Sequence, residues 1–382
     1  MLTMRTRCFA CLLASSTLAA TTQIIPWSTA DAGYGSGAIY GLAIDGTNAC
    51  LLLALNSRVQ FVRIADIAGA QSRTQLMDHA AWMAASGVNN CTPFQGFDLS
   101  GSDFVQFADG MSDEIWRINK HTGVPTKYVS KAGIASVTGG GNVSLVAVQC
   151  VIPSNGEHLF YDSTSSNILT TTGSNACSVV VSASALLAAF GPGVLPAGGM
   201  GFDGVGNLYF GTSTGSLCRY TAGVLTTVLT RADITNLILL SAANFGTMRA
   251  GPDGLFYFRN GSGTFGSLLR FSPANPAGTL ELIISGDELT NSVAASANVN
   301  NMRWHNGLGG GWAWHQFGQN GVYLTPIPEP AALIVSVFGL IWTRRVRTRK
   351  MPDAGCQHAL RYRASGIRLP ALHGNLFATH KP

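Results

Sequence analysis

The sequence predicts an all-β protein, a β-propeller of six blades, on three observations. Turns that contain glycine recur about every fifty residues, which is a repeat period typical of propellers and solenoids. A short apolar or aromatic segment follows each turn, and these segments begin at residues 51, 104, 159, 208, 255 and 312. Charged residues make up only 11% of the chain and glycine accounts for 45 of its 382 residues, which suits an extracellular β protein.

Each predicted unit continues with further strands. A second strand carries an arginine beside apolar residues, at Val59–Arg63, Glu114–Ile118, Leu217–Tyr220 and Leu268–Phe271. A third strand covers Lys127–Val129, Leu225–Leu229 and Leu280–Ile284. Alternation, β-branched residues and turns of the Asp-Gly or Asn-Gly kind indicate strands rather than helices. Six such sheets of three or four strands cover one another's faces when they close into a ring.

Two segments depart from this strand pattern. Helical periodicity at Ser72–Ala85 and Ser182–Phe190 predicts excursions between blades one and two and between blades three and four. An irregular β-sandwich or a β-helix with coincidental turn spacing is the alternative architecture.

One repeat, from Phe202 to Phe210, carries a more specific pattern that combines an Asp-Gly turn, Gly-Asn and an apolar-aromatic strand. It resembles the repeats of NHL and gluconolactonase-type propellers. The resemblance implies six blades. A lactonase-like hydrolase of this type would need a metal at the ring axis, held by Glu, Asn and Asp from different blades, and the sequence identifies no such set.

The C-terminal part contains a short Pro-Glu-Pro motif, an uncharged stretch and a basic run. The motif consists of Pro328, Glu329 and Pro330. The uncharged stretch covers Ala331–Trp342, and the basic run begins with Arg344 and Arg345. This segment, residues 326–350, resembles the PEP-CTERM sorting signal of Gram-negative bacteria. The resemblance implies a transient inner-membrane anchor, recognised and cut by an exosortase, and a protein exported to the cell surface or the extracellular space.

The physical properties of the segment agree with an anchor. Its twelve uncharged residues give about 18 Å of helix, and the arginine stems extend that reach toward the interface. A buried C-terminal helix is the alternative. The family's signal ends soon after the arginines, whereas here a basic tail, residues 351–382, follows. We predict that this tail is disordered, unless it is an artefact of the reading frame.

The N-terminus reads as a signal peptide, residues 1–32. Arg5 and Arg7 precede an apolar stretch that runs from Cys8 to Ala20. The small residues at 30–32 predict cleavage before Gly33, and cleavage after Ala20 is the second choice. The predicted propeller domain then spans residues 33–325.

Charge and motif content exclude several functions. The whole chain carries a net charge of +5, but residues 31–327 contain thirteen Lys and Arg against seventeen Asp and Glu. The basic balance therefore belongs to the targeting segments, and no nucleic-acid partner is expected. The chain has no HExxH or phosphate-loop motif, so that zinc-peptidase and nucleotide-binding functions are unsupported, and we favour a binding protein over an enzyme.

Five cysteines lie in the body: Cys50, Cys91, Cys150, Cys177 and Cys218. An oxidising compartment would permit disulfides, and Cys50–Cys91 and Cys150–Cys177 are the pairs nearest in sequence. Buried, unpaired thiols are the equal alternative. No Cys/His spacing predicts a metal site.

Acidic residues recur at the predicted turns, at Asp45, Asp98, Asp203 and Asp253. Calcium is the cofactor that such residues suggest, yet none of these turns has the density of oxygen ligands that a calcium loop supplies. We favour the interpretation that these side chains build the turns.

The densest aromatic cluster is Trp304, His305, Trp312 and Trp314. Alternation places Trp312 and Trp314 on one face of a strand, where they would stack on a flat ligand such as a sugar or fill the wedge between the last blade and the first. Packing is the favoured role.

These observations predict an exported, surface-sorted binding or structural module of the cell envelope or extracellular matrix, with extracellular polysaccharide as a candidate partner. A metal-dependent, lactonase-like propeller hydrolase is the alternative function.

Overall fold

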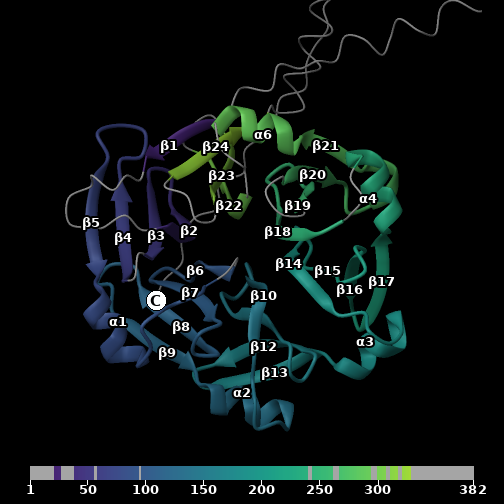
Figure 1. The fold of residues 1–382 in the computed structure, drawn as a ribbon, viewed down its shortest axis with the longest axis horizontal. Helices are drawn as coiled ribbons and strands as arrows, with labels where there is room; N and C mark the ends of the chain where they lie inside the picture. Colours follow the sequence, from purple (N-terminus) through teal and green to yellow (C-terminus); the bar gives the residue numbers. More distant parts are fainter. Residues whose placement is uncertain are drawn as a thin grey trace, which may run out of the picture. The chain divides into compact units, whose positions relative to one another are not determined.

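Six four-stranded antiparallel sheets make up a propeller in the computed structural model (Figure 1). The structure describes residues 21–26, 38–55, 58–93, 96–239, 243–260, 266–293, 299–306, 310–316 and 321–327. The first strand of each blade lies innermost, and neighbouring inner strands contact each other around the axis. The predicted all-β fold and its six blades are therefore confirmed.

The first three blades follow one another along the chain. Blade 1 contains β2 (Ala38–Asp45), β3 (Ala49–Leu55), β4 (Val59–Ala65) and β5 (Ser72–Met77). Blade 2 contains β6 (Asp98–Ser100), β7 (Phe104–Asp109), β8 (Glu114–Asn119) and β9 (Pro125–Val129). Blade 3 contains β10 (Leu145–Val151), β11 (His158–Asp162), β12 (Asn167–Gly173) and β13 (Ala176–Val181).

The last blade combines both ends of the described chain. Blade 4 contains β14 (Pro196–Phe202), β15 (Leu208–Thr212), β16 (Leu217–Thr221) and β17 (Val224–Leu229). Blade 5 contains β18 (Phe245–Ala250), β19 (Phe256–Asn260), β20 (Ser267–Phe271) and β21 (Glu281–Ile284). Blade 6 contains β22 (Val299–His305), β23 (Gly311–Gln316), β24 (Gly321–Pro326) and β1 (Thr22–Pro26).

The strands predicted after each turn are the second strands of the blades, β3, β7, β11, β15, β19 and β23. The inner strands ahead of the turns were not predicted, and in β14 close packing near the axis accounts for this, because it requires glycine there. A Cβ on Gly201 of β14 would lie 2.5 Å from the carbonyl oxygen of Met248 in the next blade. Such a strand cannot show the β-branched alternation that marks an ordinary strand.

Eight-residue helices follow the outer strands of blades 1 to 5 in the described part of the chain, at the rim of the propeller (Figure 1). They are α1 (His79–Ser86), α2 (Lys131–Thr138), α3 (Ala183–Phe190), α4 (Arg231–Ile238) and α6 (Gly286–Val293), and α5 (Pro276–Thr279) is a single turn. The helix predicted at residues 182–190 is confirmed. The helix predicted at residues 72–85 is partly wrong, because residues 72–77 form β5.

A common capping pattern explains why these short helices form. The side chain that precedes each of the first four helices accepts a hydrogen bond from the backbone of the third helical residue: Asp78, Ser130, Ser182 and Thr230. The fourth residue of all five eight-residue helices is then buried: Trp82, Ile134, Leu186, Ile234 and Leu289. Isolated helices of this length are unstable in water, so that this anchor supplies most of their stability.

Strand β1 closes the ring. Its backbone pairs with β24, from Thr22 opposite Leu324 to Pro26 opposite Gly321, and Ile25 is fully buried. Blade 1 holds the same strand from its other side, because Gln71 Nε2 donates to the Ile24 carbonyl at 2.6 Å. Residues 22–26, which the sequence assigns to the signal peptide, therefore form part of the propeller in the structure.

Thr21, which directly precedes β1, also contacts the last blade, because Thr21 Oγ1 lies 2.9 Å from Thr325 Oγ1. Loss of residues 1–32 would remove the strand that closes the ring, whereas loss of residues 1–20 would leave it intact. Residues 1–20, 27–37 and 328–382 lie outside the described residues, and no helix of the described part is long and apolar enough to cross a bilayer.

The apolar core lies between neighbouring blades, and it separates the cysteines. Cys50 packs between blades 6 and 1, whereas Cys91 packs between blades 1 and 2. Cys150 packs between blades 3 and 4, whereas Cys177 lies against the cluster between blades 2 and 3. All five body thiols are free, so that the structure has neither of the two candidate disulfides.

We expect Leu186→Ala to destabilise the protein by about 2–5 kcal/mol, because this α3 anchor is 2% exposed and its removal leaves a cavity. The neighbouring Leu187 is 55% exposed, and Leu187→Ala is the matched control, with a change within about 0.5 kcal/mol. Urea unfolding of the two variants measures both values. Equal effects would contradict the anchoring role of the fourth helical residue.

A polypeptide that begins at Thr21 should unfold in one cooperative transition, and one that begins at Gly33 should be markedly less stable, because it lacks β1. Urea unfolding of the two polypeptides measures this difference. Recovery of a stable, folded product that starts at Gly33 would show that β1 is dispensable.

We expect the five body thiols to be reduced in the folded protein. Burial raises the pKa of Cys150 to about 12 and that of Cys218 to about 11, and Cys177 alone is half-buried. In a polypeptide of residues 21–329, a thiol reagent should modify at most Cys177 under native conditions and all five cysteines in denaturant. Intact mass after alkylation counts them, and a mass loss of about 2 Da before alkylation would reveal a disulfide instead.

Candidate functional site at the propeller axis

One acidic and two basic side chains meet where the inner strands converge. Asp98 begins β6 in blade 2, Arg249 lies in β18 of blade 5 and Arg303 lies in β22 of blade 6. Arg249 Nη2 lies 2.8 Å from Asp98 Oδ2, and Arg303 Nε lies 3.1 Å from Asp98 Oδ1. Blades 2 and 5 face each other in a ring of six, so that these ion pairs cross the axis (Figure 1).

Backbone contacts fix this axial cluster, which we define as Asp98, Arg249 and Arg303. The Leu99 amide donates to Asp98 Oδ1 at 2.8 Å, which orients the carboxylate. Arg303 Nη2 donates to the Phe97 carbonyl in blade 2, and Nη1 donates to the Met302 carbonyl at 2.9 Å. The cluster therefore ties blade 2 to blade 6 as well as to blade 5.

The cluster carries more positive than negative charge. Two guanidinium groups face one carboxylate, and the side chains of Arg303, Arg249 and Asp98 are 7%, 13% and 20% exposed. Burial, and then the charge of Arg249, lower the pKa of Arg303 to about 9. The positive charge at Arg303 is therefore only partly compensated.

Several polar groups near the cluster are neutral. Burial, followed by the charges of Arg249 and Arg117, lowers the pKa of His158 to about 3. This neutral imidazole contacts Gln149 Oε1 through Nε2 at 2.8 Å. Burial also raises the pKa of the Cys150 thiol to about 12, so that it holds its proton at neutral pH.

The axis does not fit a divalent cation. The described residues contain no group of three or more His, Cys, Asp and Glu side chains that could hold a metal ion. The carboxylate of Asp98 is engaged by two guanidinium groups, which cannot ligate a metal and which repel it. The metal that a lactonase-like propeller would place here has no matching ligand set among these side chains.

The other acidic turn residues are engaged by protein groups. Asp45 Oδ1 accepts from Lys120 at 2.7 Å and Asp45 Oδ2 lies 3.3 Å from Arg63. Asp203 accepts from two backbone amides and from Asn207, and Asp253 accepts from the Leu255 amide and the Tyr257 hydroxyl. The contacts of Asp203 and Asp253 within their own loops support the interpretation that they build turns, whereas Asp45 joins blade 1 to Lys120, which follows β8 in blade 2. Asp98 differs because it pairs with two arginines, from blades 5 and 6.

The tryptophans for which the sequence left a ligand-stacking role possible are mostly buried. Trp312 and Trp314 are each 1% exposed and share one core cluster, as the alternation predicted. Trp312 lies 5.0 Å from the Tyr257 ring of blade 5, and Trp314 Nε1 donates to Thr325 Oγ1. They fill the wedge between blades 5 and 6, and not the wedge between the last blade and the first that the sequence pattern suggested.

The remaining two members of that cluster differ in exposure. Trp304 is partly buried, stands edge-on to Trp312 with ring centroids 5.2 Å apart, and donates to Asn306. His305 is buried. The sorting residues Pro328, Glu329, Pro330, Arg344 and Arg345 lie outside the described residues.

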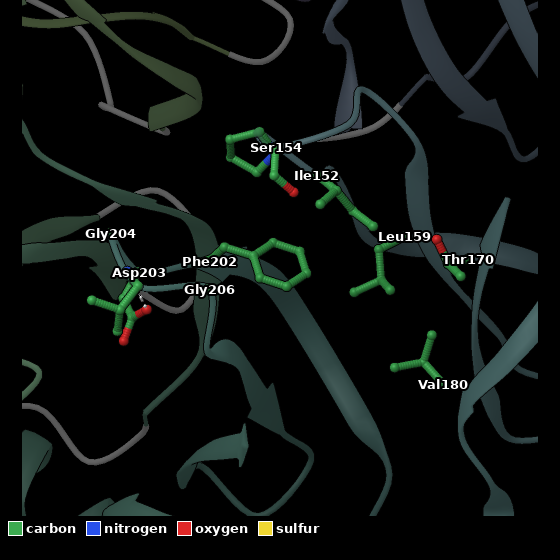
Figure 2. Close-up of a pocket in the computed structure, with 11 residues that line it drawn as sticks. Ile152, Ser154, Leu159, Thr170, Val180, Phe202, Asp203, Gly204 and Gly206 are labelled. Carbon is green, nitrogen blue, oxygen red and sulfur yellow. Dashed lines mark hydrogen bonds between the residues drawn. The ribbon is translucent and has the colours of Figure 1, made fainter. Parts of the chain in front are cut away.

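A second feature is an apolar groove of about 690 Å³ between blades 3 and 4. Figure 2 shows the Phe202 ring pointing toward Leu159 and Ile152, with Val180 on the blade 3 side. The only charged lining residue, Asp203, is hydrogen-bonded within its own loop. The groove therefore offers apolar contact and no reactive group.

Sequence reasoning missed both axial arginines. Each follows a methionine shortly before a blade turn, as Met248-Arg249 and Met302-Arg303. A cation inside an apolar segment, at equivalent places one repeat apart, is the signal that would have indicated them.

Solved structures share this fold. A gluconolactonase from Xanthomonas campestris is 10% identical, with a TM-score of 0.50, over 81% of this chain and 89% of that chain. A putative gluconolactonase is 12% identical, with a TM-score of 0.50, over 80% and 90%. A protein of unknown function from Bacteroides thetaiotaomicron is 14% identical, with a TM-score of 0.50, over 80% and 75%.

These likenesses confirm the six-bladed, gluconolactonase-type propeller as a fold and nothing further. The chain matches no protein-family profile, and no curated protein sequence matches it.

The buried His158 should make stability depend on pH. Its pKa in the folded state, about 3, lies below the ordinary value of 6.5, so that the unfolded chain binds an extra proton between those values. Stability should therefore fall as pH drops below about 6.5, by up to about 1.4 kcal/mol per unit from this group. Urea unfolding should show that His158→Gln loses this part of the slope.

The matched control is the surface residue His121, whose side chain is 52% exposed. His121→Gln should retain the slope of the parent protein, and an unchanged slope in His158→Gln would contradict a neutral, buried imidazole.

Proposed function

We propose that this chain is an exported propeller that serves as a binding or structural module of the cell envelope or extracellular matrix. The observation that carries this proposal is the axial cluster, in which Asp98 lies between Arg249 and Arg303. A metal-dependent propeller hydrolase would need several oxygen ligands at this place. Two guanidinium groups at the axis favour recognition over metal-assisted hydrolysis.

Export rests on the sequence at both ends of the chain, and the blade boundaries are compatible with it. Cleavage after Ala20 preserves β1, and β24 ends at Pro326, just before Pro328. Processing by an exosortase at the Pro-Glu-Pro motif would therefore release all six blades. In this proposal the partners are an exosortase and, transiently, the inner membrane, with extracellular polysaccharide as the candidate surface ligand.

A lactonase-like hydrolase is the second candidate. It is favoured by the solved structures of similar fold, two of which are described as a gluconolactonase or a putative one. The residues at the axis count against it, because no carboxylate there is available to a metal.

The sorting proposal predicts that Glu329→Ala is exported normally but keeps residues C-terminal to the motif, because the exosortase no longer cuts it. Intact mass of the protein from membranes and from medium distinguishes the two products. Asp287→Ala, at an exposed acidic residue of α6, is the control and should be processed normally. Identical processing of Glu329→Ala would contradict the sorting signal.

The hydrolase alternative predicts one divalent ion per chain and hydrolysis of sugar lactones that depends on it. We expect calorimetric titration with Ca²⁺, Mg²⁺, Mn²⁺ and Zn²⁺ to show no saturable site, and lactone hydrolysis to stay at the uncatalysed rate. An equimolar ion that is lost in Asp98→Asn, together with lactone turnover, would overturn the binding-module proposal.

A further inference from the structure

The axial cluster contains more positive than negative charge. Among the described residues, Asp98 is the only carboxylate that forms an ion pair with Arg249 and Arg303, while Cys150 holds its proton and His158 is neutral at physiological pH. Arg117, which donates to Gln106, adds a further cation beside them. Positive charge is therefore in excess in a largely buried place, which is unfavourable, and a bound anion would offset it.

Donor groups remain available beside this surplus charge. Arg249 Nε is buried without a hydrogen-bond acceptor among the described residues. Arg303 Nε is at ion-pair distance from Asp98 but lacks hydrogen-bond geometry, although its side chain is only 7% exposed. Both guanidinium groups can therefore donate further hydrogen bonds.

Gln106 adds a third donor on the same side of blade 2. It stands directly opposite Asp98 in the pairing of β6 with β7, so that the two side chains share one face of the sheet. Its Oε1 accepts from Ser100 and Arg117, which directs Nε2 to the donor role. Gln106 is fully buried, and Nε2 has no acceptor among the residues that the structure describes.

Solvent reaches the cluster. The Asp98 side chain is 20% exposed and that of Arg249 is 13% exposed, so that a small ligand has access without unfolding of a blade. The planar guanidinium group matches a carboxylate through two parallel hydrogen bonds.

We propose that Arg249, Arg303 and Gln106 form an axial binding site for a ligand carboxylate, as carried by an organic acid or an acidic sugar. In the unliganded protein, Asp98 engages some of the N–H groups of Arg249 and Arg303. It therefore competes with the ligand and lowers the affinity for it. This site depends on the axis alone and holds whether or not the chain is exported or sorted.

The test is thermal unfolding, supported by calorimetric titration, with acetate, glucuronate, glucose and chloride at matched ionic strength. Acetate and glucuronate should raise the unfolding temperature in a saturable way with one site per chain, and glucose and chloride should not. A clearly higher affinity for glucuronate than for acetate identifies an acidic sugar as the source of the carboxylate, and equal affinities identify a free acid. Absence of saturable binding by either carboxylate overturns the proposal.

Two substitutions localise the effect. Arg249→Gln should weaken carboxylate binding by at least about tenfold, as expected for loss of a charged hydrogen-bond partner. Arg63→Gln is the control, since Arg63 pairs with Asp45 in blade 1 away from the cluster and is 35% exposed. Binding that survives in Arg249→Gln, or that is lost equally in Arg63→Gln, places the ligand elsewhere and overturns the proposal.

Asp98→Ala provides a readout that a purely structural ion pair would not give. The variant removes the internal competitor, so that it should be less stable than the parent protein but should bind acetate more tightly. Added acetate should then restore its unfolding temperature, whereas chloride at the same ionic strength should not. If Asp98→Ala does not fold, Asp98→Asn retains the shape and serves the same comparison. Failure of acetate to stabilise the folded variant contradicts an accessible carboxylate site.

Discussion

The structure depends on closure of the ring by β1. Each blade exposes two apolar faces, and only its neighbours cover them, so that an open ring would leave the faces of blades 1 and 6 in water. Pairing of β1 with β24, and the bond from Gln71 in blade 1 to the β1 backbone, hold these two blades together. Backbone from the start of the described chain thus completes the last blade, and Ile25 of β1 adds to the core between blades 6 and 1.

The axial cluster is a consequence of the same closure. Asp98, Arg249 and Arg303 come from three blades that lie far apart in sequence, and the distances among them exist only in the closed ring. Ring closure brings like charges together and confines them, as the lowered pKa of Arg303 indicates. These three residues contribute little to the free energy of unfolding, because the desolvation cost of burying two cations exceeds their attraction to one carboxylate. Recognition of an anion accounts for their presence better than packing does.

The sequence was most informative where a residue's role is local. Glycine turns followed by aromatic strands predicted the second strand of every blade, and the arginine-bearing segments predicted four of the third strands. The short capped helices were largely missed, although a small polar cap followed four residues later by an apolar anchor is visible at Ser130 and Ile134. Eight residues are too few for periodicity to separate a helix from a turn.

Long-range features could not be predicted in this way. Strand β1 follows an apolar stretch and was assigned to the leader, because nothing nearby indicates that it pairs with residues 321–326. Asp98 was recognised only as a turn residue, since its arginine partners are brought to it by the closed ring. The wedge filled by Trp312 was assigned to the wrong side of blade 6, because alternation gives the face of a strand but not the identity of the neighbour.

The most direct test of the central claim, that the axis recognises a carboxylate and not a metal, is diffraction from crystals prepared with either acetate or Mn²⁺. Electron density shows where the carboxylate is held, and the anomalous signal of Mn²⁺ reports a site with oxygen ligands. We predict acetate oxygens within hydrogen-bonding distance of Arg249 and Arg303 and no Mn²⁺ peak at the axis. A Mn²⁺ peak beside Asp98, with the arginines turned away, would contradict it.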